Sequence, residues 1–199
     1  DRFGTWRINA AAGFQVDITQ LRGETIEQDL GHRDFTINAM ALSTDELTLI
    51  DRFDGVGDVA ARTLRLVSER AYEDDPLRPL RLPRLASALG LKIDPGTAEA
   101  TRRHARLVAE PAAERVFAEL RGLLGSDAAV EGIQLLDELG LMQVVLPELA
   151  ALKGLEQTRY HHKDAYHHTL EVLENAIELE RSDYAVFGDA AAAVKKSMA

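Results

Sequence analysis

The sequence has no cysteine among its 199 residues and no long hydrophobic run. Without cysteine there are no disulfides and no thiolate metal ligands, which fits a protein of the reducing cytoplasm. No apolar stretch approaches the roughly 20 residues that a membrane-spanning helix needs. The hydrophobic content of 46% is nevertheless enough to bury a core, so we expect a soluble, folded protein without a membrane partner.

Charge is unevenly distributed along the sequence. The formal net charge of −10, taken as a whole, argues against a nucleic-acid partner. Residues 62–121, however, hold 12 Lys and Arg against 9 Asp and Glu, a local charge of +3. A basic middle flanked by acidic ends can steer a phosphate backbone to one face of the protein.

Two short β-strands are predicted near the start of the sequence. Residues 5–10 and 14–19 alternate apolar and polar side chains around an Ala-Ala-Gly connection, a pattern typical of a β-hairpin. Within the second strand, Asp17 points to the face opposite Val16 and Ile18. A lone hairpin is marginally stable, so we expect further strands from sequence upstream of this chain.

Helical patterns dominate the sequence after residue 73. Asp75 as N-cap and Pro76 at the first helical position predict a helix that ends at Gly90. Pro83 lacks the N–H that would bond the carbonyl of Pro79, so we expect a bend there. The later segments have apolar residues at spacings of three and four, which predicts a helical bundle. The start signals of these later helices are Asp94 with Pro95, Pro111, and Ser126 or Asp127.

The segment Asp29–Ala41, DLGHRDFTINAMA, carries the strongest candidate binding chemistry. Its cationic, anionic and amide side chains, Arg33, Asp34 and Asn38, suit the phosphates and ribose of a nucleotide. The residues alone leave an alternative open, in which Asp34 caps a helix and Arg33 is solvated. The segment resembles the RRDFTINA motif of the class II tRNA nucleotidyltransferase (CCA-adding enzyme) and bacterial poly(A) polymerase family, with His32 at the first Arg.

Further motifs of that family follow in order along the sequence. Residues 51–65 resemble D-P-x-x-G-x-x-D-L-x-x-x-x-[IL]-R. Here we expect Gly55 and Gly57 to allow a tight turn and Asp58 to cap a short helix. Residues 74–78, DDPLR, resemble the EDxxR motif that reads the base of the incoming nucleotide in the family. The remaining matches are AERVFAELRGLL at 113–124 and the LPEL and HTL elements between 140 and 174.

The resemblance implies an α+β fold. It is the fold of a partial polymerase-β-like nucleotidyltransferase head, with short antiparallel strands plus helices, followed by an all-helical neck and body. The predicted divisions are 1–64 for the partial head, 65–125 for a neck that binds the nucleotide base and RNA, 126–160 for the body, and 161–199 for the start of a truncated HD domain.

The resemblance also implies roles for individual side chains. Arg33 and Asp34 would bind ribose and phosphate, with Asn38 supporting them. Asp75 and Arg78 would read the base edge. A basic stripe would bind RNA, although a solvated basic face is the alternative for such a stripe. The residues predicted to bind RNA are Arg81, Arg84, Arg102 and Arg103.

A metal site is predicted only in part. The family's Asp-x-Asp pair, which would hold Mg²⁺ in the intact enzyme, is expected ahead of residues 3–5 (Phe-Gly-Thr) and does not occur in this sequence. Asp17 would complete that metal set, or else is an exposed strand carboxylate. His168 would be the first ligand of an incomplete HD-type metal site, since no His follows it. Three further histidines lie close by in the sequence, and their spacing alone is weak evidence for a metal site. They are His161, His162 and His167.

We therefore expect an internal fragment of a tRNA nucleotidyltransferase that adds CCA to tRNA 3′ ends from CTP and ATP. The fragment alone is expected to be inactive, because the paired metal-binding carboxylates are missing. The alternatives are a poly(A) polymerase, a non-catalytic RNA-binding module and an HD phosphohydrolase fragment. The predicted partners are tRNA, CTP and ATP, and the predicted location is the cytoplasm. The sequence does not indicate whether the protein is a monomer or an oligomer.

Overall fold

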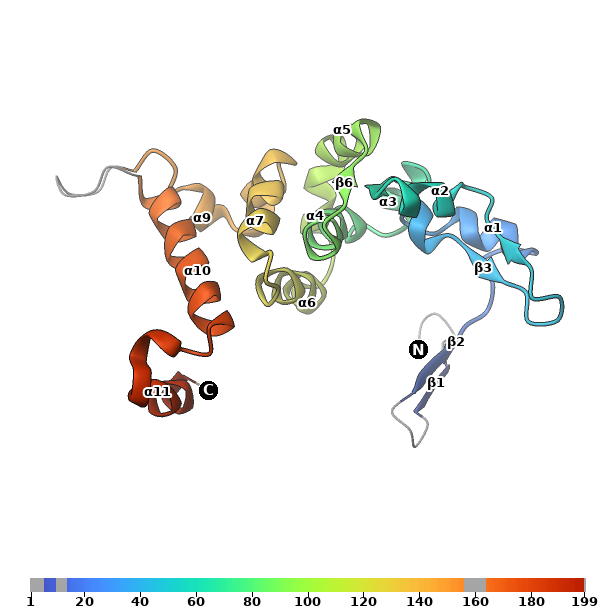
Figure 1. Ribbon diagram of the computed structural model, residues 1–199. Coiled ribbons are helices and arrows are strands. Elements are labelled where there is room, and N and C mark those ends of the chain that lie inside the picture. Colours follow the sequence, from blue (N-terminus) through green and yellow to red (C-terminus); the bar gives the residue numbers. More distant parts are fainter. Residues whose placement is uncertain (1–5, 10–13, 156–163, 199) are drawn as a thin grey trace. The chain divides into compact units, whose positions relative to one another are not determined.

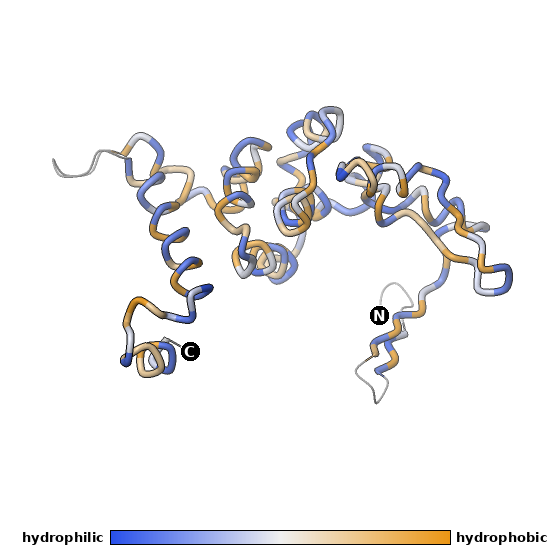
Figure 2. Tube along the Cα trace, viewed as in Figure 1, coloured by the Kyte–Doolittle hydropathy of each residue, from blue (hydrophilic) through white to orange (hydrophobic). Residues whose placement is uncertain are grey.

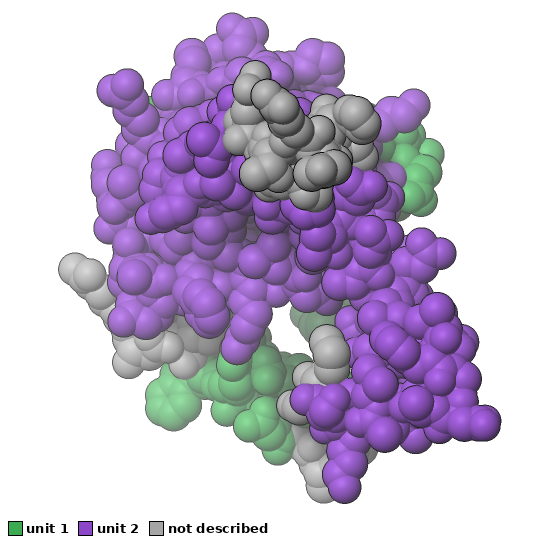
Figure 3. Space-filling view, turned by 90° about the vertical axis from the view of Figure 1, so that its left-hand side faces the viewer, with its two compact units in different colours: residues 1–75 green, residues 76–199 purple. Residues whose placement is uncertain are grey.

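The computed structural model describes residues 6–9, 14–155 and 164–198 (Figure 1). The chain divides into two compact units, residues 1–75 and residues 76–199 (Figure 3). Below they are called the first and the second unit. Short strands occur in a mostly helical chain, which confirms the predicted α+β fold class.

The first unit contains two antiparallel strand pairs and several short helices. Strand β1 pairs with β2, and β3 pairs with β4. In chain order its elements are β1 (Trp6–Asn9), β2 (Gln15–Ile18), α1 (Ile26–Gly31), the 3-10 turn η1 (Thr36–Asn38), β3 (Ala41–Leu42), β4 (Leu49–Ile50), α2 (Gly55–Ala60), β5 (Thr63–Leu64) and α3 (Arg70–Asp74).

The β1–β2 hairpin has the predicted pattern of alternating side chains (Figure 2). Trp6 lies opposite Ile18, and Ile8 lies opposite Val16. Because side chains alternate across a strand, these four share one face, and Asp17 lies on the other face opposite Arg7.

The hydrophobic core of the first unit includes part of the RDFTINA segment (residues 33–39). Phe35, Leu64 and Tyr72 are fully buried. Phe35 forms an antiparallel bridge with Leu66, flanked by hydrogen bonds from Thr36 N–H to the Arg65 carbonyl and from Val67 N–H to the Asp34 carbonyl. The candidate binding segment is therefore held in place by its backbone as well as by its side chains.

The second unit is helical apart from one short strand segment. Helix α4 packs against α6 and α7. Its elements are α4 (Arg78–Leu89), β6 (Lys92–Ile93), α5 (Pro95–His104), the 3-10 turn η2 (Ala105–Ala109), α6 (Ala113–Leu124), α7 (Ala129–Glu138), α8 (Met142–Val145), α9 (Pro147–Ala150), α10 (Ala165–Arg181), η3 (Ala185–Ala190) and α11 (Ala191–Met198).

Close helix packing forms the core of the second unit. Leu80, Leu123 and Leu136 are buried on α4, α6 and α7. A Cβ added at Gly132 would lie 2.8 Å from the Leu123 side chain and 3.1 Å from the Ser87 hydroxyl. Glycine at this position therefore allows α7 to approach its neighbours closely, and overpacking there would be destabilising.

Some predicted helix boundaries are confirmed and others are wrong. The N-caps of α6 and α7 are Ala112 and Ala128, not Pro111 and Ser126 or Asp127. The Asp94 carboxylate accepts the Thr97 N–H at 2.8 Å as the predicted N-cap of α5, and Gly90 ends α4 with a φ of 60°. Helix α4, however, begins at Arg78 and not at Pro76. Asp75 is the C-cap of α3, because its N–H bonds the Ala71 carbonyl and its backbone is extended.

Helix α4 continues through Pro83 as one element. Among the described residues, no helix combines the length and the apolar character that crossing a membrane requires.

Candidate functional site

Arg33 is positioned by a buried carboxylate on the preceding helix. Its Nη2 and Nε donate to Asp29 Oδ2 at 2.7 and 3.1 Å, and the Arg22 N–H donates to Asp29 Oδ1 at 2.8 Å. Burial raises the pKa of Asp29, but these hydrogen bonds outweigh burial and hold that pKa below its usual value. The Arg33 side chain keeps 47% of its surface exposed, so it can still receive an anion.

Asp34 and Asn38 form a second polar cluster in the same segment. Asp34 is buried, and its Oδ1 accepts the Phe35 N–H at 2.8 Å and the Asn38 Nδ2–H at 3.3 Å. The residue before η1 is Phe35, without a side-chain cap. Asp34 is therefore not the N-cap of η1, while Arg33 pairs with Asp29 and keeps 47% of its side chain exposed.

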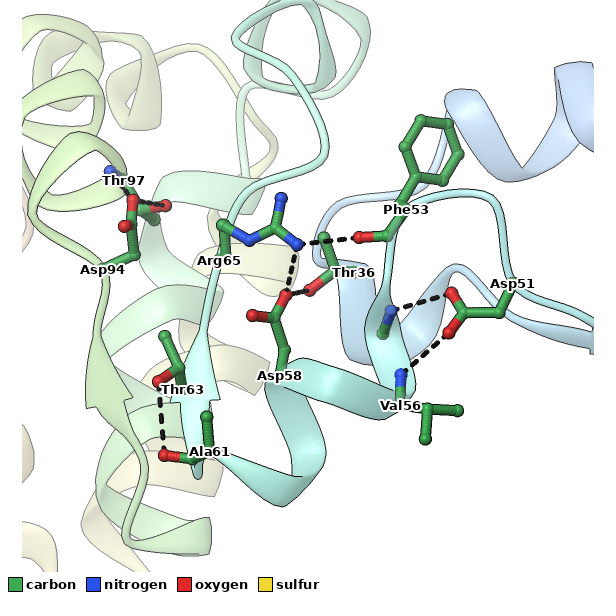
Figure 4. Close-up of polar contacts among 11 residues, drawn as sticks. Thr36, Asp51, Phe53, Val56, Asp58, Ala61, Thr63, Arg65, Asp94 and Thr97 are labelled. Carbon is green, nitrogen blue, oxygen red and sulfur yellow. Dashed lines mark hydrogen bonds and ion pairs between the residues drawn. The ribbon is translucent and has the colours of Figure 1, made fainter.

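A polar network joins this segment to α2 and to Arg65, the residue directly after β5 (Figure 4). Asp58 Oδ2 accepts the Thr36 hydroxyl at 2.6 Å and pairs with Arg65 Nη2 at 2.8 Å. The same Arg65 nitrogen donates to the Phe53 carbonyl at 2.8 Å. Through these contacts, the motif at residues 51–65 stabilises the RDFTINA segment (residues 33–39).

Asp58 is not the cap of α2, contrary to the prediction. The N-cap position is Asp54, which makes no side-chain cap hydrogen bond, and the Asp51 carboxylate instead accepts the N–H groups of Gly55 and Val56 at 2.7 and 2.9 Å (Figure 4). The backbone N–H donors of Val56 and Gly55 lower the pKa of Asp51. Asp58 lies inside the helix and is buried.

Gly55 is needed for space and not for a special backbone angle. A Cβ at this position would lie 2.4 Å from the Thr36 carbonyl oxygen and 2.9 Å from Met40. The left-handed residue of the turn is Asp54, with a φ of 59°. The tight-turn prediction is therefore wrong for Gly55, which is explained by the close approach of α2 to η1. A Cβ at Gly57 would lie 2.6 Å from the Asp54 carboxylate, so glycine there makes room for the turn.

His32 connects the RDFTINA segment to the DDPLR segment. His32 Nδ1 lies 2.8 Å from Asp74 Oδ2, and both residues belong to the first unit. Asp75 follows Asp74 directly, and Arg78 is the buried first residue of α4. The sequence predicts both motifs but not this contact between them.

The predicted RNA-binding arginines lie in the second unit and differ in their surroundings. Arg84 Nε donates to Glu119 Oε2 at 2.5 Å, which ties α4 to α6, and Arg81 is half-buried. Arg102 and Arg103 are exposed on α5, where Arg102 donates to the Glu138 carbonyl at 3.0 Å. Arg103 pairs with Glu99 at 3.0 Å.

The residues predicted for metal binding do not form a metal-binding cluster in the described part of the chain. Asp17 accepts two hydrogen bonds from Arg7 at 2.7 and 2.9 Å, which lower its pKa. His168 lies on α10, whose N-cap Asp164 pairs with His167 at 2.6 Å. His161 and His162 lie outside the described residues. Within residues 6–9, 14–155 and 164–198, no group of three His, Asp or Glu side chains could hold a metal ion.

Comparisons with known proteins match both units. A family model described as "Poly A polymerase head domain" matches residues 3–65, and one described as "Probable RNA and SrmB-binding site of polymerase A" matches residues 90–153. The chain is 39% identical over 179 residues to an A-adding tRNA nucleotidyltransferase of Deinococcus radiodurans, covering 87% of this chain and 41% of that protein. Both units therefore match proteins of the tRNA nucleotidyltransferase and poly(A) polymerase family.

Two other members of this family are similarly related. A CC-adding tRNA nucleotidyltransferase of Thermus thermophilus is 41% identical over 160 residues, which are 78% of this chain and 36% of that protein. The crystal structure of the Bacillus stearothermophilus CCA-adding enzyme in complex with CTP has a TM-score of 0.64 at 33% identity, covering 70% of this chain and 37% of that one. The chain thus spans about two fifths of the length of the curated relatives described here.

Proposed function

We propose that this chain is the nucleotide-selecting and RNA-binding part of a tRNA nucleotidyltransferase, whose parent protein adds CCA to tRNA 3′ ends from CTP and ATP. The observation that carries the proposal is the 2.8 Å contact of His32 with Asp74, which joins the first nucleotide motif to the start of the DDPLR segment within the first unit. The names of the relatives support it, since one adds A and another adds CC.

Arg33 is assigned to the phosphates of the nucleotide. Asp29 orients its guanidinium, and its exposed surface leaves N–H donors for a second acceptor. Asp34 and Asn38 are assigned to the ribose side of the same segment, where their mutual hydrogen bond fixes their orientation. A positioned cation beside hydrogen-bonding groups is the chemistry that a nucleoside triphosphate requires.

Asp75 and Arg78 are assigned to the base edge. A carboxylate accepts hydrogen bonds and a guanidinium only donates them, so together they complement the amino group and ring nitrogen that cytosine and adenine share. Guanine and uracil present the opposite pattern at those positions. A mismatched, desolvated polar group costs about 1–3 kcal/mol, which is enough to reject them.

Arg102 and Arg103 are assigned to the phosphates of tRNA. Both are exposed on α5, within the residues matched by the model of a probable RNA-binding site. Arg81 and Arg84 are assigned weaker roles in the same function, because Arg84 is already held by Glu119. We include cytoplasmic location in the proposal because tRNA is the substrate.

The described residues do not fit a magnesium site, since Asp17 is bound to Arg7 and no cluster of three ligands occurs among them. We place Mg²⁺ in the proposal only as an ion held by carboxylates in a part of such proteins that this chain does not span. His168 stays a predicted first ligand of an HD-type site. The four-part division into head, neck, body and HD segment also stays a prediction.

The test is transfer of labelled CMP and AMP to a tRNA that ends before its CCA, measured for the parent protein and for this chain alone. We expect the parent to add both nucleotides and the chain alone to add neither. Repeated AMP addition to an unrelated RNA primer would identify a poly(A) polymerase. RNA binding by the parent without any transfer would overturn the proposal in favour of a binding module.

A further inference from the structure

We propose that His32 is a positioning residue for nucleotide selection, which fixes Asp75 relative to the Arg33–Asp34 segment by holding the adjacent Asp74. The inference rests on the proposed function, because it concerns the base-reading role of Asp75. It assigns a task to the position at which this sequence departs from the family motif, which usually has Arg there.

His32 is itself held firmly in place. It is the C-cap of α1, and its N–H donates to the Asp29 carbonyl at 3.0 Å. The next residue, Arg33, is bound by the buried Asp29 carboxylate. An imidazole attached to such a fixed backbone has few conformations, so it sets the position of its partner rather than following it.

Asp74 transmits that position to Asp75. It is the last residue of α3, and Asp75 ends the helix through the hydrogen bond of its N–H to the Ala71 carbonyl at 3.3 Å. A shift of Asp74 would therefore change where the helix ends and where the Asp75 carboxylate points.

The nearby Arg70 cannot substitute for His32 as the partner of Asp74. Arg70 Nε lies 3.8 Å from Asp74 Oδ1, on the same helix, and the Arg70 side chain is 73% exposed. The His32 contact is shorter and joins two different helices, and its partners are only 32% and 24% exposed. Solvent screens the pair with Arg70 more strongly, and this pair cannot fix α3 relative to α1.

The test is carried out in the parent protein with H32A, D74A, the double variant, H32R and the control R70A. The readouts are the ratio of kcat/KM for CTP over UTP, the same ratio for ATP over GTP, and the Kd for tRNA. We expect H32A and D74A each to lower both ratios by about five- to tenfold, as loss of one side-chain hydrogen bond implies. The double variant should fall no further, because both substitutions remove the same contact.

H32R should keep both ratios within about twofold, since its guanidinium supplies an N–H donor that can reach Asp74, and R70A should do the same. The tRNA affinity should be unchanged in every variant. If H32A lowers the unfolding midpoint strongly, H32L, which keeps the volume of the side chain without its hydrogen bond, replaces it.

Unchanged ratios in H32A and H32L would overturn the inference, and so would an equal loss of kcat/KM for all four nucleotides. A parent protein that transfers neither CMP nor AMP would instead contradict the proposed function, and this outcome is visible in the wild type before any variant is compared.

Discussion

The Thr36 hydroxyl donates a 2.6 Å hydrogen bond to the Asp58 carboxylate, and both residues are buried. This contact joins the middle of the RDFTINA segment to α2, 22 residues further along the chain. Arg65, directly after β5, completes the network. The nucleotide motif is therefore supported by a motif that contributes no group to the proposed nucleotide contacts.

Replacement of Asp58 is expected to destabilise the first unit. D58A leaves the Thr36 hydroxyl and the Arg65 guanidinium without their acceptor, which costs about 1–3 kcal/mol in the free energy of unfolding. D58N keeps an acceptor for Thr36 and should cost less. Urea unfolding of the chain measures both, with D45N at an exposed position as control. Equal stability of D58A and D45N would show that the network does not support the fold.

Substitution of Gly55 tests the close approach of α2 to η1. The added Cβ of G55A would lie 2.4 Å from the Thr36 carbonyl oxygen, so the backbone must shift. We expect a loss of about 1–3 kcal/mol in unfolding free energy, as for other overpacked sites. G31A is the matched control, because its Cβ would make an ordinary 3.6 Å contact with Phe53. Thermal unfolding in which both variants behave alike would contradict this packing.

Asp164 predicts a specific pH dependence of stability. Backbone hydrogen bonds from His167 and Gly154 lower its pKa from 3.8 to about 2. A depressed folded-state pKa means that the contribution to stability is complete above the unfolded-state value and is lost as pH falls through the folded-state value. The stability difference between wild type and D164N should therefore shrink as pH falls from 3.8 towards about 2. A difference that stays constant across this window would contradict the assignment.

The two exposed arginines of α5 predict a salt-dependent contribution to tRNA binding. In the parent protein, R102A and R103A should each weaken tRNA binding and reduce the slope of log K against log salt by about 1, if each contacts one phosphate. R181A is the control, because Arg181 is an exposed arginine on α10 outside the matched RNA-binding region. A slope unchanged from wild type in both α5 variants would remove them from the interface.

Local sequence signals predicted the elements whose causes are local. The alternation in the hairpin, the Asp94 cap with Pro95, and the Gly90 stop each depend on a few neighbouring residues, and the structure has all three. The pairing of Arg33 with Asp29 is also local, since an acid four residues before a base on a helix is a recognisable pattern.

Contacts between distant residues could not be read from the sequence. His32 and Asp74 are 42 residues apart, and Thr36 and Asp58 are 22 apart. The predicted start of α4 is wrong because Asp-Pro signals a helix start in isolation, whereas here α3 ends at the same aspartate. The prediction that Asp58 caps α2 is wrong because the Asp51 carboxylate reaches two N–H groups of that helix, four and five residues ahead.

The base-reading role proposed for Arg78 is tested most directly by nucleotide selection in an Arg78 variant. In the parent protein, R78A should lower incorporation of CTP and ATP and relax the rejection of UTP and GTP, with tRNA affinity nearly unchanged, because the donor facing the base edge is lost. R84A, two turns further along α4 and held by Glu119, should leave base choice unchanged. Because Arg78 is buried, the unfolding midpoint is measured alongside, and R78K provides a milder variant. An R78A protein that keeps full discrimination for CTP and ATP and loses only tRNA affinity would contradict the base-reading role.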